Sequence, residues 1–109
     1  MNILFICSRN QWRSPTGEAI YKRRQGLQVR SAGTEPSARV RASAKLVQWA
    51  DIIFVMEKRH KQRLSQAFPD DMQDKSVVIL DIPDDYQYMD EELISLIESG
   101  VAPYLATED

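Results

Sequence analysis

The chain has 109 residues, of which 43% are hydrophobic and 28% charged, a composition typical of one compact globular unit and unlike that of disordered or collagen-like chains. The net charge of -2 is unevenly spread, since residues 1–63 carry 13 Lys or Arg against 4 Asp or Glu and residues 64–109 carry 1 against 12. No stretch interleaves basic and aromatic residues as a groove for single-stranded nucleic acid does, so we expect no nucleic-acid partner.

The chain opens on a predicted strand and helix. Residues 3–7 form a continuous apolar run of the kind found in buried parallel strands. Residues 14–25 follow as a predicted helix, because Ser14 is a good N-cap and Pro15 suits the first helical position.

The rest of the chain alternates strand and helix in the same way. We expect strands at 27–32, 51–56 and 76–80, and helices at 40–49, 59–68 (ended by Pro69) and 90–99. Such alternation predicts a parallel sheet with helices on both faces and right-handed crossovers. Ligands of these folds bind at the carboxyl ends of the strands, where the loops 7–14, 33–40 and 81–89 lie.

The first of these loops, CSRNQWRS at 7–14, combines three features of phosphoryl chemistry. Successive backbone N–H groups that lead into a helix N-terminus form an anion site. The same field stabilises a thiolate at Cys7, whose sulfur would be a nucleophile, and the Ser14 hydroxyl can donate to it. The guanidinium of Arg13 can contact two phosphate oxygens at once.

The run ILFICSRNQWRSPTGEA resembles the signature of the low-molecular-weight protein tyrosine phosphatases. SAGT at 31–34, ADIIFVMEKRHKQRL at 50–64 and IPDDY at 82–86 resemble further segments of that family, in the same order. The last of them looks like the family's Asp-Pro-Tyr loop. The expected fold class is therefore α/β, a three-layer, doubly wound, parallel sheet of four strands in the order 2-1-3-4, with the phosphate-binding loop after strand 1, in a single domain over 1–109.

The resemblance implies hydrolysis of a phosphate monoester in two steps. Cys7 would attack phosphorus and form a cysteinyl-phosphate. Arg13 and the loop amides would stabilise the charge on the phosphoryl oxygens. Asp84 matches the family's acid, which protonates the leaving phenolate and then activates water. No metal or organic cofactor is needed.

Further residues receive binding roles from the same resemblance. Asn10 matches an asparagine that holds the loop's shape, and Tyr86 matches an aromatic wall of the slot for the phenyl ring. Besides Cys7 and Arg13, the expected phosphate-binding loop contains Ser8, Arg9, Asn10, Gln11, Trp12 and Ser14.

The sequence departs from the family pattern at several points. Arg9 stands where the family usually has glycine, and Trp12 stands where many members have a second cysteine. Asp85 replaces the proline of the acid loop, which leaves two candidate acids, and we favour Asp84 over Asp85. Only 16 residues separate Thr34 from Asp51, fewer than in typical members, so we expect one wall of the substrate cleft to be missing.

These observations favour a cytoplasmic protein tyrosine phosphatase. Its partners would be a phosphotyrosine protein or a small aryl phosphate, with a phosphate or sulfate ion able to occupy the loop. An alternative is a weak or inactive binder of phosphate or phosphopeptides on the same scaffold. An arsenate reductase is a third possibility, but it would need an external thiol, because Cys7 is the only cysteine.

The remaining expectations concern location and the single histidine. No apolar run approaches the roughly 20 residues that cross a bilayer, so we expect no membrane partner. MNILFIC lacks the basic leader of a signal peptide, and a lone cysteine fits a reducing compartment. His60, in EKRHKQR, is predicted to lie on a solvated helix face without a catalytic role.

Overall fold

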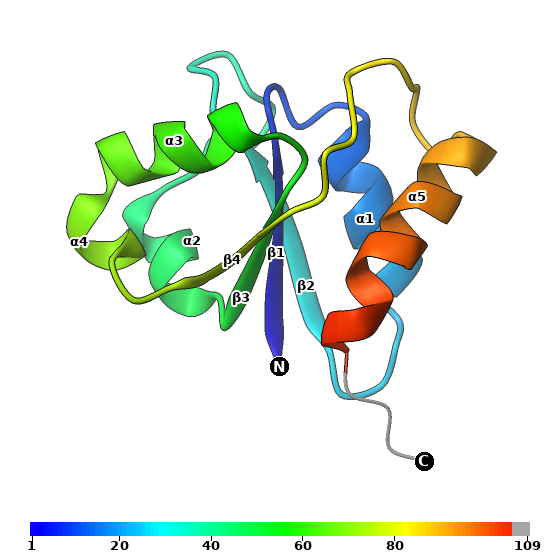
Figure 1. Cartoon of the computed structure of the whole chain (residues 1–109), viewed down its shortest axis with the longest axis horizontal. Helices are drawn as coiled ribbons and strands as arrows, with labels where there is room; N and C mark the ends of the chain where they lie inside the picture. The colour runs from blue at the N-terminus through cyan, green and yellow to red at the C-terminus, as the bar shows by residue number, and fades with distance from the viewer. Residues whose placement is uncertain (106–109) are drawn as a thin grey trace.

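The computed structural model describes residues 1–105, which form a four-stranded sheet between two layers of helices (Figure 1). All strand pairs are parallel, and the order is β2-β1-β3-β4. The strands are β1 (Asn2–Cys7), β2 (Gln28–Gly33), β3 (Ile52–Val55) and β4 (Ser76–Ile79). The predicted doubly wound sheet and its strand order are therefore confirmed.

Helices cover both faces of the sheet, as Figure 1 shows. One face carries α1 (Arg13–Tyr21) and α5 (Glu91–Val101), which continues into a short 3-10 helix, η1 (Ala102–Tyr104). The other face carries α2 (Ala44–Trp49), α3 (Lys58–Ala67) and α4 (Pro69–Met72). No helix among residues 1–105 is long and apolar enough to cross a membrane.

The two cores follow from the alternation of side chains along β1. Ile3, Phe5 and Cys7 pack with residues of α1 and α5, whereas Leu4 and Ile6 pack with residues of α2, α3 and α4. All five residues are at most 3% exposed. Burial on both faces explains why this strand is apolar at every position from Ile3 to Cys7 instead of alternating with polar residues.

The helix boundaries differ from the sequence prediction in ways that concern the functional loop. The first helix begins at Arg13 and not at Ser14. The Ser14 side chain is hydrogen-bonded within the loop at 7–14, which we call the cysteine loop, and therefore does not cap the helix. The helix also ends at Tyr21, short of the predicted residue 25.

The second helix begins at Ala44 and not at residue 40. Residues 40–42 are extended because they pair with the end of β2: the Gly33 N–H donates to the Val40 carbonyl, and the Ala42 N–H donates to the Gly33 carbonyl. The Ser43 hydroxyl then caps α2 by accepting from the Leu46 N–H at 3.2 Å.

The third predicted helix is followed by a short helix that the sequence analysis missed. Pro69 was expected to end the helical region, but it occupies the first turn of α4, where its missing N–H costs nothing. The loops after β1, β2 and β4 meet at the carboxyl edge of the sheet (Figure 1), as expected for this topology.

Candidate active site

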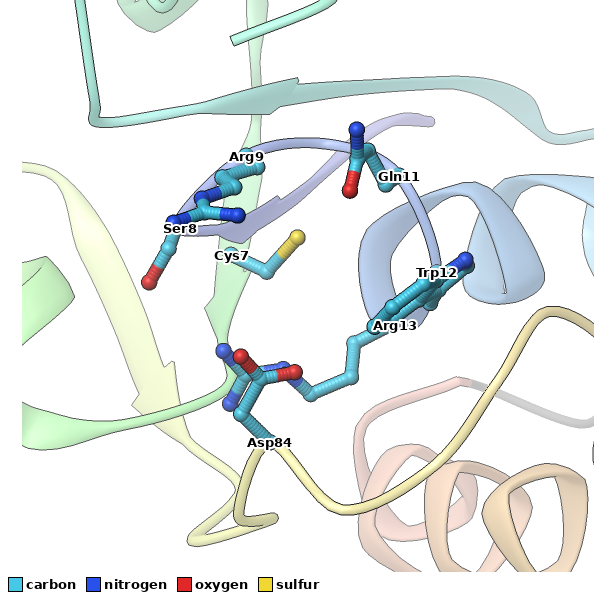
Figure 2. A pocket seen from close by; sticks show the side chains of 7 residues that line it. All are labelled: Cys7, Ser8, Arg9, Gln11, Trp12, Arg13 and Asp84. Atoms are coloured by element: carbon cyan, nitrogen blue, oxygen red, sulfur yellow. The ribbon is translucent and has the colours of Figure 1, made fainter. Parts of the chain in front are cut away.

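A small pocket of about 30 Å³ lies at the carboxyl end of β1 (Figure 2). Six of its residues come from the end of β1, the loop after it and the start of α1, and one comes from the loop after β4. The lining residues are Cys7, Ser8, Arg9, Gln11, Trp12, Arg13 and Asp84. Cys7 is 3% exposed, and its sulfur points into the space that the loop encloses (Figure 2).

A chain of hydrogen bonds leads to the cysteine sulfur. The Ser14 hydroxyl oxygen lies 2.9 Å from the Cys7 sulfur, and it accepts a hydrogen bond of 2.8 Å from the Asn10 amide. Because the oxygen accepts from Asn10, its own proton can point to the sulfur or to the Ala32 carbonyl, which is farther away at 3.3 Å. The Ser14 hydroxyl is therefore placed to donate to the Cys7 sulfur.

Asn10 shapes the loop through both its backbone and its side chain. Its φ of 57° lies in the left-handed region, which asparagine tolerates better than most residues. Its amide nitrogen also donates to the Ser31 hydroxyl at 2.9 Å, and Ser31 donates in turn to Glu18. The residue is fully buried, so these bonds fix the curvature of the loop from inside.

Residues 34–39, which we call the brace segment, hold the loop from outside. N–H groups of this segment donate to four successive loop carbonyls at 2.9–3.1 Å: Thr34 N to Cys7 O, Glu35 N to Ser8 O, Arg39 N to Arg9 O and Arg39 Nε to Asn10 O. The approach is close, since a Cβ on Gly33 would lie 2.5 Å from the Ser8 carbonyl oxygen.

The brace segment therefore turns the loop carbonyls away from the pocket. Within residues 1–105, the N–H groups of residues 8–12 donate to no protein acceptor. Successive N–H groups of this kind, next to the N-terminus of α1, form the type of concavity that binds an oxyanion.

Arg13 is buried beside the pocket with its charge compensated. Only 2% of its side chain is exposed, and its Nη1 donates to Glu57 at 2.5 Å and to the Ile82 carbonyl at 2.8 Å. Its Nε lies 3.7 Å from the Asp84 carboxylate, whose side chain is 52% exposed. Figure 2 shows the guanidinium of Arg13 beside the Asp84 carboxylate.

Glu57 connects this arginine to the start of α3. Its carboxylate also accepts from the Arg59 guanidinium at 3.2 Å and from the backbone N–H of His60, the third residue of α3. Burial opposes the charged form of this carboxylate, but the hydrogen bonds from Arg59 and Arg13 outweigh that effect and lower its pKa to about 2. Glu57 is therefore ionised throughout the neutral range.

His60 corrects the sequence prediction. It was expected on a solvated helix face, but it is only 1% exposed. Its Nδ1 accepts from the Glu57 N–H at 3.0 Å, and its Nε2 lies 2.9 Å from the Ser8 hydroxyl. Its place in the first turn of α3 turns it toward the cysteine loop, while residues 58, 59 and 61–63 are exposed.

The structure separates the two candidate acids. Asp84 lines the pocket, whereas Asp85 is exposed and is not among the lining residues. Tyr86, expected as an aromatic wall, is also outside the lining, and its hydroxyl donates to Glu92 at 3.1 Å. None of residues 35–50 lines the pocket either, so the shortened segment provides the brace and no wall.

Sequence reasoning missed Glu57, His60 and the brace segment. One signal was present: Glu57 and His60 have the spacing of a capping box, in which each side chain bonds the other's backbone N–H. That pattern predicts that a helix begins at this point. Among residues 1–105 there is no group of three or more His, Cys, Asp or Glu side chains that could hold a metal ion.

Comparison with known proteins gives the following similarities. No family model matches the chain. It is 30% identical, in an alignment of 95 positions, to the protein-arginine-phosphatase of Bacillus subtilis (strain 168), over 62% of this chain and 63% of the relative. The chain thus spans less than two thirds of the length of that curated relative.

Two solved structures illustrate the likeness of the fold. One is a cysteine-to-serine variant of the arginine phosphatase YwlE with a phosphorylated active-site serine (TM-score 0.73, 23% identity, 96% of this chain and 95% of the other). The other is the tyrosine phosphatase Wzb from Escherichia coli K30 in complex with phosphate (TM-score 0.75, 23% identity, 94% of both chains).

Proposed function

We propose that this chain, a member of the low-molecular-weight protein tyrosine phosphatase family, is a cysteine-dependent phosphatase that hydrolyses phosphotyrosine or a small aryl phosphate. The observation that carries the proposal is the Cys7 sulfur, 2.9 Å from the Ser14 hydroxyl, at the base of a pocket that Arg13 and Asp84 also line.

The first step transfers the phosphoryl group to sulfur. The Cys7 thiolate forms a bond to phosphorus while the bond to the phenolic oxygen breaks, and Asp84 gives that oxygen its proton. Asp84 suits this role because it lies at the exposed mouth of the pocket, where a leaving group departs.

The second step hydrolyses the cysteinyl-phosphate. Asp84, now a carboxylate, removes a proton from a water molecule as its oxygen attacks phosphorus, and the sulfur leaves as a thiolate. In both steps the N–H groups of residues 8–12 and the Nε–H of Arg13 stabilise the equatorial oxygens. Glu57 orients Arg13 by occupying its Nη1.

A second candidate substrate is phosphoarginine, the substrate class named for the Bacillus subtilis relative. Ser8, Gln11 and Asp84 give the pocket a polar lining, and Trp12 is the only aromatic residue in it. Such a lining supplies acceptors for a guanidinium leaving group, whereas a phenyl ring would have only Trp12 to pack against.

The test is hydrolysis of p-nitrophenyl phosphate from pH 5 to 8 by the wild type, Cys7→Ser, Asp84→Ala and Asp85→Ala. We expect no activity for Cys7→Ser, a loss of about 100-fold for Asp84→Ala and a small change for the adjacent Asp85→Ala. A wild type that binds phosphate without turnover would contradict the proposal and would identify a phosphate receptor.

Substrate choice is a separate measurement. Matched peptides that differ only in phosphotyrosine or phosphoarginine would be compared by release of phosphate. A higher kcat/KM for phosphotyrosine supports the proposed substrate, and a higher value for phosphoarginine establishes the second candidate.

A further inference from the structure

A second hollow, of about 400 Å³, adjoins the catalytic pocket and has no part in the mechanism proposed above. It lies along one face of α1, and we call it the α1 groove. Its lining residues are Pro15, Glu18, Ala19 and the C-cap residue Lys22 on that face, with Arg39 and Tyr88 from other segments. Gln11 lines both cavities, so they meet at this residue, which Figure 2 shows across the Cys7 sulfur from Asp84.

The groove leads away from the cysteine loop. Pro15 follows the loop directly, and Lys22 comes seven residues later, which is about 10 Å along the helix axis. An extended peptide advances about 3.3 Å per residue, so this distance matches about three residues of a bound chain. The groove is therefore long enough to hold residues that flank a phosphorylated side chain, whereas a small aryl phosphate has no part that reaches Lys22.

Lys22 supplies an uncompensated positive charge at the far end of the groove. Glu18 is four residues before it, at the spacing of a helical ion pair, but the Glu18 carboxylate accepts from the Ser31 hydroxyl at 2.6 Å instead. Within residues 1–105, Lys22 forms no ion pair. The hydrogen bonds that connect Asn10, Ser31 and Glu18 thus leave the Lys22 ammonium free to bind an anion.

Arg39, from the brace segment, supplies a second cation close to the cysteine loop. Its Nε donates to the Asn10 carbonyl at 3.1 Å, which fixes the side chain against the loop. In the part of the chain that the structure describes, its guanidinium has no carboxylate partner. The groove therefore has two positive charges, Arg39 near the loop and Lys22 at the far end, and one carboxylate, Glu18, whose oxygen is already hydrogen-bonded.

The remaining lining residues suit a polypeptide. Tyr88 is 53% exposed, and its ring and the apolar surfaces of Pro15 and Ala19 can pack against the side chains of a bound chain. The Gln11 amide can both donate to and accept from a peptide backbone. Acidic side chains of that peptide would complement the two cations, because opposite charges on two surfaces favour their association.

We propose that the α1 groove binds acidic residues that flank the phosphorylated residue of a protein substrate. The inference rests on the proposed function, and it specifies the substrate class as a phosphoprotein with acidic residues within about three positions of the phosphorylated side chain. Because an ion pair between exposed side chains contributes little, we expect each cation to change kcat/KM by about twofold to fivefold.

The experiment compares three phosphotyrosine peptides of one length, which carry glutamate, glutamine or lysine at the three positions on each side of the phosphotyrosine. Their kcat/KM is measured for the wild type, Lys22→Gln and Lys22→Glu at low ionic strength, where the attraction is least screened. We expect the wild type to prefer the acidic peptide, Lys22→Gln to lose about twofold to fivefold of that preference, and Lys22→Glu to shift it toward the lysine peptide. Turnover of p-nitrophenyl phosphate, which has no flanking residues, provides the reference for each variant.

The matched control is Arg23→Gln. Arg23 is exposed, lies next to Lys22 and carries the same charge, but it does not line the groove, so its loss should leave the preference unchanged. The inference is overturned if the wild type hydrolyses the acidic and the neutral peptide equally well, or if Arg23→Gln and Lys22→Gln reduce the preference by the same amount.

The readouts separate this inference from the proposed function. A wild type that hydrolyses p-nitrophenyl phosphate without preference among the peptides refutes only the role of the groove. If the wild type hydrolyses nothing, the proposed function fails, and the affinity for fluorescently labelled peptides tests the groove. The acidic peptide must then bind more tightly than the neutral one, by a margin that Lys22→Gln reduces, and equal affinities would overturn the inference.

Discussion

The Cys7 sulfur and the Ser14 hydroxyl oxygen lie 2.9 Å apart in the buried base of the pocket. Ser14 accepts from Asn10, so its own proton can point to the sulfur. This pair connects the nucleophile to the first turn of α1.

Replacing Ser14 by alanine should slow the alkylation of Cys7, because it removes the hydroxyl that lies 2.9 Å from the sulfur. The loss of this hydrogen bond justifies a reduction of the rate by about tenfold. The measurement is the rate of alkylation by iodoacetamide at pH 6, read by mass, which is unambiguous because Cys7 is the only cysteine. The exposed Ser65→Ala on α3 is the control, and equal rates for both variants would contradict the prediction.

Glu57→Gln should destabilise the protein by about 3 kcal/mol, because it removes the carboxylate that compensates a buried guanidinium. Added phosphate should raise the melting temperature of this variant more than that of the wild type, since the anion supplies the missing charge near Arg13. The control is Glu35→Gln, whose partner Arg63 is 52% exposed at 3.8 Å, a pair expected to contribute little.

Gly33→Ala should separate the brace segment from the cysteine loop. The added methyl group would lie 2.5 Å from the Ser8 carbonyl oxygen, a backbone atom that cannot move without shifting the loop. We expect a cost of about 1–3 kcal/mol and a loss of activity in the fraction that folds. Gly100→Ala is the comparison, because its new methyl group meets only the mobile end of Leu80 and should leave activity intact.

The stability of the protein should fall as the pH is lowered from about 6.5 to about 4. His60 has its usual pKa of 6.5 in the unfolded chain and a pKa of about 4 in the folded one, mainly because of burial and then because of Arg13. Between these values the unfolded state binds more protons, so the free energy of unfolding decreases with decreasing pH, by on the order of 3 kcal/mol.

Urea denaturation from pH 4 to 7 measures this dependence. The variant His60→Gln cannot titrate, so its stability should change less over the same range. If the free energy of unfolding fell equally with decreasing pH in the wild type and in His60→Gln, the pH dependence would not come from His60. The lowered pKa of Glu57 acts at lower pH, since its contribution is lost only as the pH falls from about 4.5 toward 2.

Much of the fold was predictable because β1 and β3 are buried on both faces, which makes them continuous apolar runs. The part of the site that was predictable lies within two short segments. The residue types of 7–14 and of the acid loop at 82–86 indicated their chemistry without any knowledge of the fold. Of the two candidate acids, Asp84 lines the pocket and Asp85 does not, and the role of Asp84 as the acid is a prediction.

What could not be predicted depends on tertiary contacts. The Ser14 hydroxyl can cap a helix or bind the loop, and only the position of Cys7 and Asn10 decides between them. His60 lies in a strongly charged segment, so composition favours exposure, whereas the crossing of α3 over the cysteine loop buries it. Residues 40–42 have helical spacing, but pairing with Gly33 is available to them and replaces the helix.

The brace segment has a consequence for how an anion would bind. Its four hydrogen bonds to successive loop carbonyls form on folding, so the conformational entropy of the loop is lost before any ligand arrives. Binding then needs no ordering of the backbone, and the intrinsic affinity is retained in full. Phosphate association should accordingly depend on ionic strength and viscosity, as an encounter limited by diffusion and charge. The backbone N–H groups of Thr34, Glu35 and Arg39, which donate to the loop carbonyls, should already exchange slowly in the empty protein.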